Sequence, residues 1–376
     1  MTPLLAWLGI GLLVALVCGR ALPAADAPPS PARQPATRFD PLGPDQVDLA
    51  VDQAVAYLVS RQGASGAISS DRGSSNATAM TSLAIMAMAA VGHQPPDPTP
   101  AGEALRKGLA FILRDGRQNA EGYFGQHDGS RMYGHGITTL MLSELLGMGV
   151  DAPQDQLIRQ RCQKAVDLIL RAQQVRKHAN HAGGWRYEPK SPDADLSVTV
   201  WQVMALRSAK NAGLDVPGQA IQQAVEYLQR SYAARSSRGE RSRGEAPGGF
   251  SYQPGGRQPT FAMTAAGLLA MQVCGQYDAA EVAGAARWLA DRPVEWQTRW
   301  FFYGLYYYAQ GMYQRGGQYA DTARKTVENL LLAHQRPDGS WEPHDSTERN
   351  TGPVYATAMA VLSLSVKYHY LPIYQR

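Results

Sequence analysis

Two short stretches of the chain carry side chains that can transfer protons. Tyr133 and His135 lie in a Tyr-Gly-His-Gly sequence, and Asp193 and Asp195 lie in an Asp-Ala-Asp sequence. An imidazole exchanges protons near neutral pH, and paired carboxyl groups can act as acid and base or hold a cation. The same residue types also build helix-entry turns and N-caps, so each stretch has an alternative interpretation that is purely structural.

A dense run of aromatic residues between positions 296 and 313 is a candidate ligand site. Such a run can line a cavity for an isoprenoid or a sugar, and it can equally form part of a helical core. The candidate ligand-binding residues are Trp300, Phe301, Tyr303, Tyr307 and Tyr355.

No complete metal or cofactor set accompanies these residues. His178 and His181 have near metal-ligand spacing without a third ligand. A glycine-rich phosphate loop is also missing. We therefore predict no metal and no cofactor. The pairs His344-Asp345 and Glu348-Arg349 are interpreted as parts of a solvated loop, with a catalytic His-Asp pair as the alternative.

The elements that would position these side chains form an internal repeat. In five segments a Thr is followed by an aliphatic residue at +4 and by Leu or Met at +7. These positions share one face of an α-helix, so one helix recurs. The residue at +6 is small in four segments, and Glu144 is the exception, which makes it a candidate functional acid or a member of an ion pair. The segments are Thr81-Ile85-Met88, Thr138-Leu142-Leu145, Thr199-Val203-Leu206, Thr264-Leu268-Met271 and Thr357-Val361-Leu364.

Each Thr helix follows a first amphipathic helix and a turn that contains glycine. The turn of the last repeat is Gln335-Arg336-Pro337-Asp338-Gly339-Ser340-Trp341, and Gln62 begins a similar turn in the first repeat. A less regular unit precedes the last repeat, with Thr298 as its candidate threonine. One hairpin cannot bury its apolar face alone, so successive hairpins must stack. With no competing strand pattern, the predicted fold is all-α, an (α/α)6 toroid of six helical hairpins.

The chain begins with a predicted leader. Leu4 to Cys18 is an unbroken run of apolar residues and glycines, which is short for a membrane span and typical of a signal peptide. We predict a signal peptide over 1–25, a Pro/Ala-rich disordered tether over 26–46 and the toroid over 47–376. Export to the periplasm or the extracellular space follows, with no membrane span after leader cleavage. An uncleaved anchor and a lipid on Cys18 are the alternatives.

Charge and cysteine content narrow the possible partners. The formal net charge of +4 is too weak and too dispersed to favour nucleic acid. The charged segment from Arg235 to Glu245 is interpreted as a solvated loop, with a basic patch for a partner as the alternative. Cys162 and Cys274 are the cysteines that remain after export; we predict buried free thiols, with a bridge as the alternative.

The turn from Gln335 to Trp341 resembles the QW motif of squalene and hopene cyclases. The Thr helices resemble the inner helices of those enzymes and of protein prenyltransferase β subunits. The region from about Val47 to Arg376 is similar to exported bacterial proteins that carry prenyltransferase/squalene-oxidase repeats. The resemblance implies an α/α toroid of the terpenoid cyclase superfamily, with Gln335, Gly339 and Trp341 in structural roles.

The catalytic signatures of these families are missing from their expected positions. Anchored on Thr199, the cyclase motif D-x-D-D falls on Asp195-Leu196-Ser197-Val198. Ser197 therefore stands where an acid should protonate the substrate, and a hydroxyl is far too weak an acid for that step. No His stands directly before a repeat Thr and no D-x-C occurs, so the prenyltransferase zinc ligands are missing. The Cys-Gly-Glu-Gln of thioester domains is replaced at Cys274 by Cys-Gly-Gln-Tyr.

Two functional hypotheses follow, and the sequence leaves open whether the protein is an enzyme. In the first, a binding module holds an apolar small molecule, a glycan or a protein segment in the mouth or lumen of the ring. In the second, an enzyme has its own site at the mouth, of a terpenoid isomerase or cyclase-like type or a polysaccharide lyase type. Its acids and bases are Tyr133, His135, Glu144, Asp193 and Asp195. Convergence of these side chains at one end of the ring would favour the enzyme.

Overall fold

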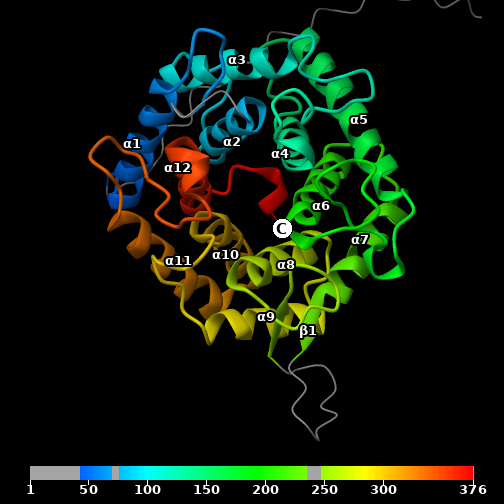
Figure 1. Ribbon diagram of the computed structural model, residues 1–376. Helices are drawn as coiled ribbons and strands as arrows, with labels where there is room; N and C mark the ends of the chain where they lie inside the picture. The colour runs from blue at the N-terminus through cyan, green and yellow to red at the C-terminus, as the bar shows by residue number, and fades with distance from the viewer. Residues whose placement is uncertain (1–42, 70–75, 235–246, 376) are drawn as a thin grey trace, which may run out of the picture. The chain divides into compact units, whose positions relative to one another are not determined.

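The computed structural model describes residues 43–69, 76–234 and 247–375. Within the compact unit that spans Asp40–Arg376, these residues form twelve α-helices arranged in a ring (Figure 1). The predicted leader, most of the predicted tether and the charged segment 235–245 lie outside the described residues. In the part of the chain that is described, no helix is both long and apolar enough to cross a membrane.

The first helix of each hairpin lies on the outside of the ring, and the second lies on the inside (Figure 1). The outer helices are α1 (Gln46–Ser60), α3 (Pro100–Leu113), α5 (Ala152–Gln173), α7 (Gly218–Ser231), α9 (Ala280–Ala290) and α11 (Gly317–Leu332). The inner helices are α2 (Ala77–Ala90), α4 (Arg131–Glu144), α6 (Leu196–Asn211), α8 (Phe261–Val273), α10 (Phe301–Arg315) and α12 (Gly352–Leu364). Each inner helix packs against the next, and α12 packs against α2, which closes the ring. The predicted all-α toroid of six hairpins is confirmed.

The two sets of helices differ in how they bury their side chains. An outer helix buries one stripe, as α7 does with Ile221, Val225 and Leu228. An inner helix is packed on nearly all sides: of the 14 residues of α2, only Met80 is not buried. A helix that is apolar all round is stable only in such a position, and this explains why the Thr helices carry so few charges.

Four of the five repeat threonines bind the turns that lead into them. In these four the hydroxyl oxygen accepts a hydrogen bond from the backbone N–H of an apolar turn residue. The pairs are Thr81 with Ile68 (3.0 Å), Thr199 with Trp185 (3.0 Å), Thr264 with Phe250 (3.1 Å) and Thr357 with Trp341 (3.1 Å). Each of these N–H groups is buried, so the threonine satisfies a donor that would otherwise destabilise the fold.

A glutamine at the end of four outer helices ties each of them to the next. Gln335 Nε2 donates to the carbonyl oxygen of Gly339 (3.0 Å) and to that of Ala50 in α1 (2.8 Å). Because Gln335 follows α11, this contact closes the outer ring. The other glutamines bind the next outer helix in the same way, in the pairs Gln62 with Ala104 (2.9 Å), Gln118 with Arg161 (2.8 Å) and Gln173 with Ala220 (2.9 Å).

Gly339 and Trp341 complete the last turn. Gly339 has a φ of +84°, and a Cβ atom there would overlap the Gln53 carbonyl of α1. Trp341 is buried, and its Nε1 donates to the Leu331 carbonyl (2.9 Å). The turn therefore needs a residue without a side chain at 339 and an indole donor at 341.

Three details of the sequence analysis are corrected or settled by the structure. Thr298 is not a repeat threonine, because α10 begins at Phe301 and the Thr298 hydroxyl accepts from Glu295 N (3.0 Å) in the preceding turn. A short antiparallel ribbon that we did not predict joins β1 (Tyr232–Ala234) to β2 (Gly248–Phe250). Cys162 and Cys274 are free and buried.

The inner helices all point in the same direction along the axis of the ring. Neighbouring inner helices meet through residues at similar distances from their first residues, such as Ser82 with Thr138 (3.0 Å) and Glu144 with Ser208. We call the end of the ring where the inner helices begin the mouth, and the end where they finish the base.

The C-terminal segment occupies the base. After α12, two 3-10 turns, η3 (Ser365–Lys367) and η4 (Pro372–Tyr374), lead the chain toward the centre of the ring (red in Figure 1). The backbone N–H of Ile373 donates to Glu144 Oε2 of α4 (3.1 Å), and the hydroxyl of Tyr374 pairs with that of Tyr306 in α10. Residues 365–375 therefore connect inner helices on different sides of the ring.

Aromatic side chains fill the middle of the lumen. Trp201 of α6 stacks on Tyr306 of α10 with ring centres 5.8 Å apart, and it meets Tyr307 edge-on at 5.7 Å. Since α8 separates α6 from α10 in the ring, these side chains meet across the lumen. All three are buried. Within the described residues, these three side chains fill the middle of the lumen, which we call the waist, and the C-terminal segment occupies the base.

Candidate functional site

Tyrosine side chains gather at the mouth, one from each of five hairpins. We call Tyr133 (α4), Tyr187 (before α6), Tyr252 (before α8), Tyr303 (α10) and Tyr355 (α12) the tyrosine cluster. The rings of Tyr133 and Tyr187 lie 5.9 Å apart, and the hydroxyls of Tyr187 and Tyr252 are 2.7 Å apart. Tyr355 is close enough to Tyr303 and Tyr133 for their charges to contribute to raising its pKa.

Ser197, in the first turn of α6, connects the cluster to a buried acid. The Tyr133 hydroxyl donates to Ser197 Oγ, which in turn donates to Asp195 Oδ1 (2.6 Å). The Tyr303 hydroxyl donates to the Ser197 carbonyl oxygen (2.9 Å). One serine thus receives tyrosines from α4 and α10, on two sides of the mouth.

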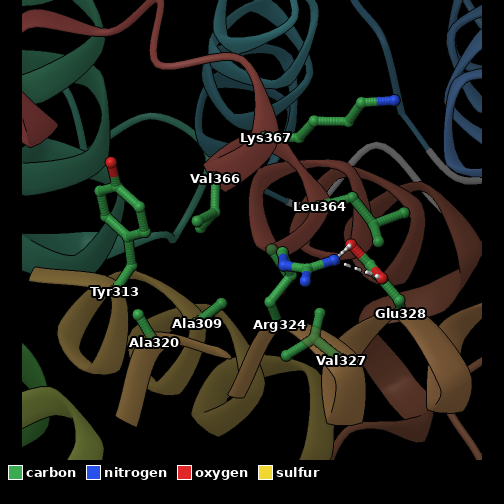
Figure 2. A pocket seen from close by; sticks show the side chains of 10 residues that line it. Ala309, Tyr313, Ala320, Arg324, Val327, Glu328, Leu364, Val366 and Lys367 are labelled. Atoms are coloured by element: carbon green, nitrogen blue, oxygen red, sulfur yellow. Dashed lines mark hydrogen bonds and ion pairs between the residues drawn. The ribbon is translucent and has the colours of Figure 1, made fainter. Parts of the chain in front are cut away.

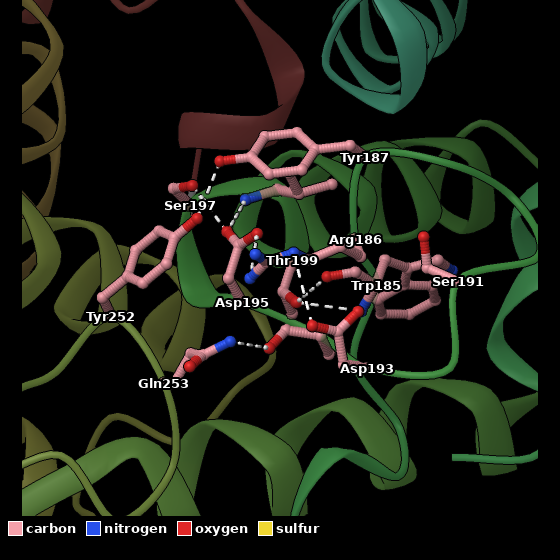
Figure 3. Close-up of polar contacts among 12 residues, drawn as sticks. Trp185, Arg186, Tyr187, Ser191, Asp193, Asp195, Ser197, Thr199, Tyr252 and Gln253 are labelled. Atoms are coloured by element: carbon pink, nitrogen blue, oxygen red, sulfur yellow. Dashed lines mark hydrogen bonds and ion pairs between the residues drawn. The ribbon is translucent and has the colours of Figure 1, made fainter.

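Asp195 caps α6 and pairs with Arg186. Its Oδ1 accepts from Val198 N (2.9 Å), and its Oδ2 lies 3.4 Å from Arg186 Nη1. Asp193 Oδ2 lies 3.5 Å from Arg186 Nε, so one guanidinium serves both carboxyl groups (Figure 3). Asp195 is fully buried, and this burial raises its pKa despite the hydrogen bond from Ser197. The structural interpretation of Asp195 as an N-cap is therefore correct, and the same residue also touches the cluster through Ser197.

At the rim of the cluster, the guanidinium group of Arg186 lies close to the rings of Tyr187 and Tyr252. Arg186 lies 5.0 Å from the ring centre of Tyr187 and 5.7 Å from that of Tyr252, within the range of cation–π attraction. Figure 3 shows both rings beside Asp195 and Ser197.

Glu348 is a buried acid on the opposite side of the cluster. Its carboxylate oxygens accept from Phe302 N (3.1 Å) and Tyr303 N (2.9 Å), and the Tyr355 hydroxyl donates to it (3.3 Å). Burial raises the pKa of Glu348 to about 7. The interpretation of this residue as part of a solvated loop is wrong, because its side chain is only 1% exposed. It holds the first N–H groups of α10, whose N-cap residue Trp300 offers no capping side chain.

The tyrosines are partly accessible at the mouth, and we call the surface that they form the recess. Tyr133 and Tyr355 are half-buried, and burial raises the pKa of both phenols well above the usual value. Tyr303 is more enclosed, and Tyr252 stands on the rim with 39% of its surface exposed.

His135 lies outside this cluster, on the outer side of α4. Its Nδ1 accepts from Phe124 N (3.3 Å), and its Nε2 bonds to the Ala165 carbonyl of α5 (3.1 Å). Full burial lowers its pKa to about 4. It thus replaces Thr138 as the residue that binds the turn, and both ring nitrogens are engaged by the backbone.

Glu144 lies at the base, at the other end of α4 from Tyr133. Ser208 Oγ and Ile373 N donate to its two oxygens, and burial raises its pKa to about 7. Of the five predicted acids and bases, the structure brings together Tyr133, Asp193 and Asp195, and it places His135 and Glu144 elsewhere.

The five predicted ligand-binding aromatic residues also lie in different places, and only two of them belong to the tyrosine cluster. Tyr303 and Tyr355 belong to the cluster, and Tyr307 is buried in the waist. Phe301 packs between Trp296 and Phe302, with ring centres 4.7 and 5.1 Å apart. Trp300 is 41% exposed at the start of α10.

Sequence reasoning missed Tyr187 and Tyr252, although a signal for both was present. They occupy the same place after two similar turns, Gly-Gly-Trp-Arg-Tyr and Gly-Gly-Phe-Ser-Tyr. The two turns align through Trp185 and Phe250, each of which donates its N–H to a repeat threonine. Extending the repeat by two residues would therefore have predicted both tyrosines on the same side of the ring.

Two cavities lie near the base. The one between α10, α11 and α12 (Figure 2) has a volume of about 20 Å³, room for a water molecule. The second has a volume of about 440 Å³ and lies beside the C-terminal segment. It is lined by Tyr313, Gly316, Gly317, Ala320, Asp321, His369, Tyr374 and Gln375. In the described ranges, no group of three or more His, Cys, Asp and Glu side chains is arranged to hold a metal ion.

The fold places the chain among known α/α toroids. The sequence matches no family model and no curated protein. An inactive variant of the α-1,6-mannanase GH76A from Salegentibacter sp., in complex with α-1,6-mannotetraose, is similar in structure with a TM-score of 0.58 and 9% identity over 86% of this chain and 99% of that one. The type II terpene cyclase MstE from Scytonema, in complex with merosterolic acid A, has a TM-score of 0.52 and 16% identity over 87% and 98% of the two chains.

A third similar structure is described as a possible member of the GH105 family from Klebsiella pneumoniae. Its TM-score is 0.56, with 12% identity over 90% of this chain and 96% of that one. At these identities the likeness concerns the fold alone. The protein has the α/α toroid fold that these structures share.

Proposed function

We propose that the protein is a ligand-binding module whose site is the recess lined by the tyrosine cluster. The observation that carries this proposal is the convergence of five tyrosines from five hairpins at the mouth. Tyrosine offers a large rigid face and a polar tip, which suits recognition more than core packing.

The use of the nearby acids supports binding more than catalysis. Asp195 and Glu348 each hold the first N–H groups of an inner helix, α6 and α10 respectively. Their positions are explained by the negative charge or acceptor that a helix N-terminus requires. The tyrosine hydroxyls of the recess cap no helix, so helix capping does not explain their positions.

A thermal-shift panel tests the proposal on the mature protein. The probes are α-1,6-mannotetraose, an oligogalacturonate, geranylgeraniol and a short peptide. The mouth variant combines Tyr133→Ala with Tyr355→Ala, and the matched control is Tyr313→Ala in the cavity at the base. We expect at least one probe to raise the Tm of the wild type and of the control but not of the mouth variant. Protection that is lost in the control, or absent with all four probes, would contradict the proposal.

The folding of the mouth variant needs a separate check, because Tyr133 and Tyr355 are half-buried. Circular dichroism shows whether the double variant keeps its helices. If it does not, Tyr252→Ala on the exposed rim replaces it, since that side chain is 39% exposed.

A hydrogen-bond chain favours an enzyme as the second candidate. From Tyr133 through Ser197 to Asp195, this chain links the recess to a buried carboxyl group of raised pKa, and it can pass a proton between them. Product analysis on the same probes tests it. Turnover that disappears in Tyr133→Phe and in Asp195→Asn supports the enzyme, and turnover that survives both changes refutes this site.

Export is part of the proposal. The apolar leader over 1–25 and the Pro/Ala-rich stretch over 26–46 support a secreted module joined to its leader by a tether. N-terminal sequencing of the protein recovered from the medium or periplasm tests this, and a protein retained with an intact leader would contradict cleavage.

A further inference from the structure

We infer that the recess takes a neutral, hydroxyl-rich ligand, a chain of sugar residues. This inference rests on the proposed function and narrows it to one chemical class. It is carried by the direction of the phenolic hydrogen bonds, the local balance of charge and the filling of the lumen below the recess.

The phenols of the recess present acceptors to a ligand. Tyr303 donates its proton to the Ser197 carbonyl, Tyr133 donates to Ser197 Oγ, and Tyr355 donates to the carboxyl group of Glu348. A phenol has one proton, so the oxygens of the half-buried Tyr133 and Tyr355 keep lone pairs for a donor from the ligand, whereas Tyr303 is buried against Tyr307. Sugar hydroxyls are donors as well as acceptors. A ligand that carries acceptors alone, such as a carboxylate or a phosphate, would find these oxygens unfavourable.

The charges around the cluster are balanced locally. Arg186 pairs with Asp193 and Asp195, and on the rim Arg131 Nε lies 3.3 Å from Glu188 Oε1. Glu348 and the neighbouring Asp345 are compensated by the backbone N–H groups of Trp300, Phe302 and Tyr303 at the start of α10. An anionic ligand would have to displace Asp193 or Asp195 from Arg186, and a cationic one would find each carboxyl group already engaged. The site therefore selects for a neutral ligand.

The depth of the site argues against an elongated apolar ligand. Trp201, Tyr306 and Tyr307 pack against one another directly below the level of Tyr303, whose ring centre lies 4.9 Å from that of Tyr307. An isoprenoid chain would need the volume that these side chains fill. The tyrosines of the mouth, with the exposed ring of Tyr252 on the rim, instead fit a chain that lies across the mouth.

Affinity electrophoresis tests the inference with named probes. Native gels contain α-mannan, xylan or mixed-linkage β-glucan as neutral polysaccharides, and polygalacturonate or chitosan as charged ones. The variants Tyr133→Phe and Tyr355→Phe keep the ring and remove the oxygen. The control is Tyr313→Phe at the base. All variants are first compared with the wild type by thermal melting, and Tyr252→Ala serves as the rim variant if one of them is unstable.

We expect at least one neutral polysaccharide to retard the wild type and the control. Each removed oxygen should weaken the Kd by about five- to tenfold, the loss of one neutral hydrogen bond. Retardation by charged polysaccharides alone, by none of the five, or equally in all mouth variants overturns the inference. If geranylgeraniol or the peptide protects the protein through Tyr133 and Tyr355 in the thermal-shift panel, ligand binding at the mouth stands and only the sugar class fails.

Discussion

Replacement of Glu144 by Gln should change how the stability of the protein depends on pH. Glu144 is 3% exposed at the base, where Ser208 Oγ and Ile373 N donate to its oxygens. A glutamine can accept the Ile373 N–H and donate to Ser208, so it mimics the neutral acid. The variant therefore removes the ionisation and keeps the contacts of the C-terminal segment.

The magnitude follows from the pKa. Burial raises the pKa of Glu144 from 4.5 to about 7. Because the folded-state pKa is raised, the folded state favours the protonated form. Stability is greatest below the unfolded value and falls as the pH rises through 7. At about 1.4 kcal/mol per pKa unit, the full effect is about 3 kcal/mol, of which about 2.5 kcal/mol appears between pH 5 and pH 8.

Urea unfolding at several pH values between 5 and 8 measures this effect. Wild type and Glu144→Gln should have similar free energies of unfolding at pH 5, and the variant should be more stable by about 2 kcal/mol at pH 8. The difference between the two proteins isolates Glu144, because buried His135, whose pKa is lowered to about 4, gives the opposite slope in both. Glu121→Gln, at an exposed turn position, is the matched control. Parallel pH curves for wild type and Glu144→Gln would show that the C-terminal segment does not bury this acid.

Three further predictions concern the repeat contacts. Gln335→Ala should lower the free energy of unfolding by about 2–3 kcal/mol in urea titrations, because two carbonyl oxygens lose their donor and the outer ring loses its closing contact. Thr199→Val should cost about 1–3 kcal/mol by the same measurement, because the buried Trp185 N–H is left without an acceptor, whereas Thr322→Val, at an exposed site on α11, should cost little. His135→Gln should remove the loss of stability that the wild type shows as the pH falls below 6.5 toward 4, since a histidine with a lowered folded-state pKa stabilises only while neutral; an unchanged acid limb in thermal melts would refute this.

The architecture was predictable because the same sequence pattern recurs several times in the chain. Five Thr helices and the Gln-to-Trp turn repeat the same spacing, and their hydrogen bonds repeat in the structure at Thr81, Thr199, Thr264 and Thr357. The irregular unit shows where this reasoning stops. There Glu348, in the loop before α12, caps α10. It lies 46 positions after Phe302 and 45 after Tyr303, whose N–H groups it accepts, so no local pattern reveals the contact.

Departures from the repeat predicted buried polar residues better than they predicted the site. Glu144 breaks the small position of its helix, and it binds the C-terminal segment at the base. His135 precedes a repeat threonine, and it replaces that threonine in binding the turn. Each is polar because a backbone group needs a partner, so an unusual polar residue in a repeat fold first calls for a structural explanation.

The mouth was harder to predict because no single repeat contains it. Five hairpins contribute one tyrosine each, from an inner helix in three cases and from a turn in two, and the first hairpin contributes the half-buried Met80 instead. The shared pattern of the repeats builds the ring, whereas the chemistry of the mouth depends on how the repeats differ at their first turns. Structural neighbours with 9–16% identity share the ring and carry little information about those positions. The function of this toroid is therefore best sought by changing the tyrosines of the mouth one at a time, against controls on the same scaffold at the base.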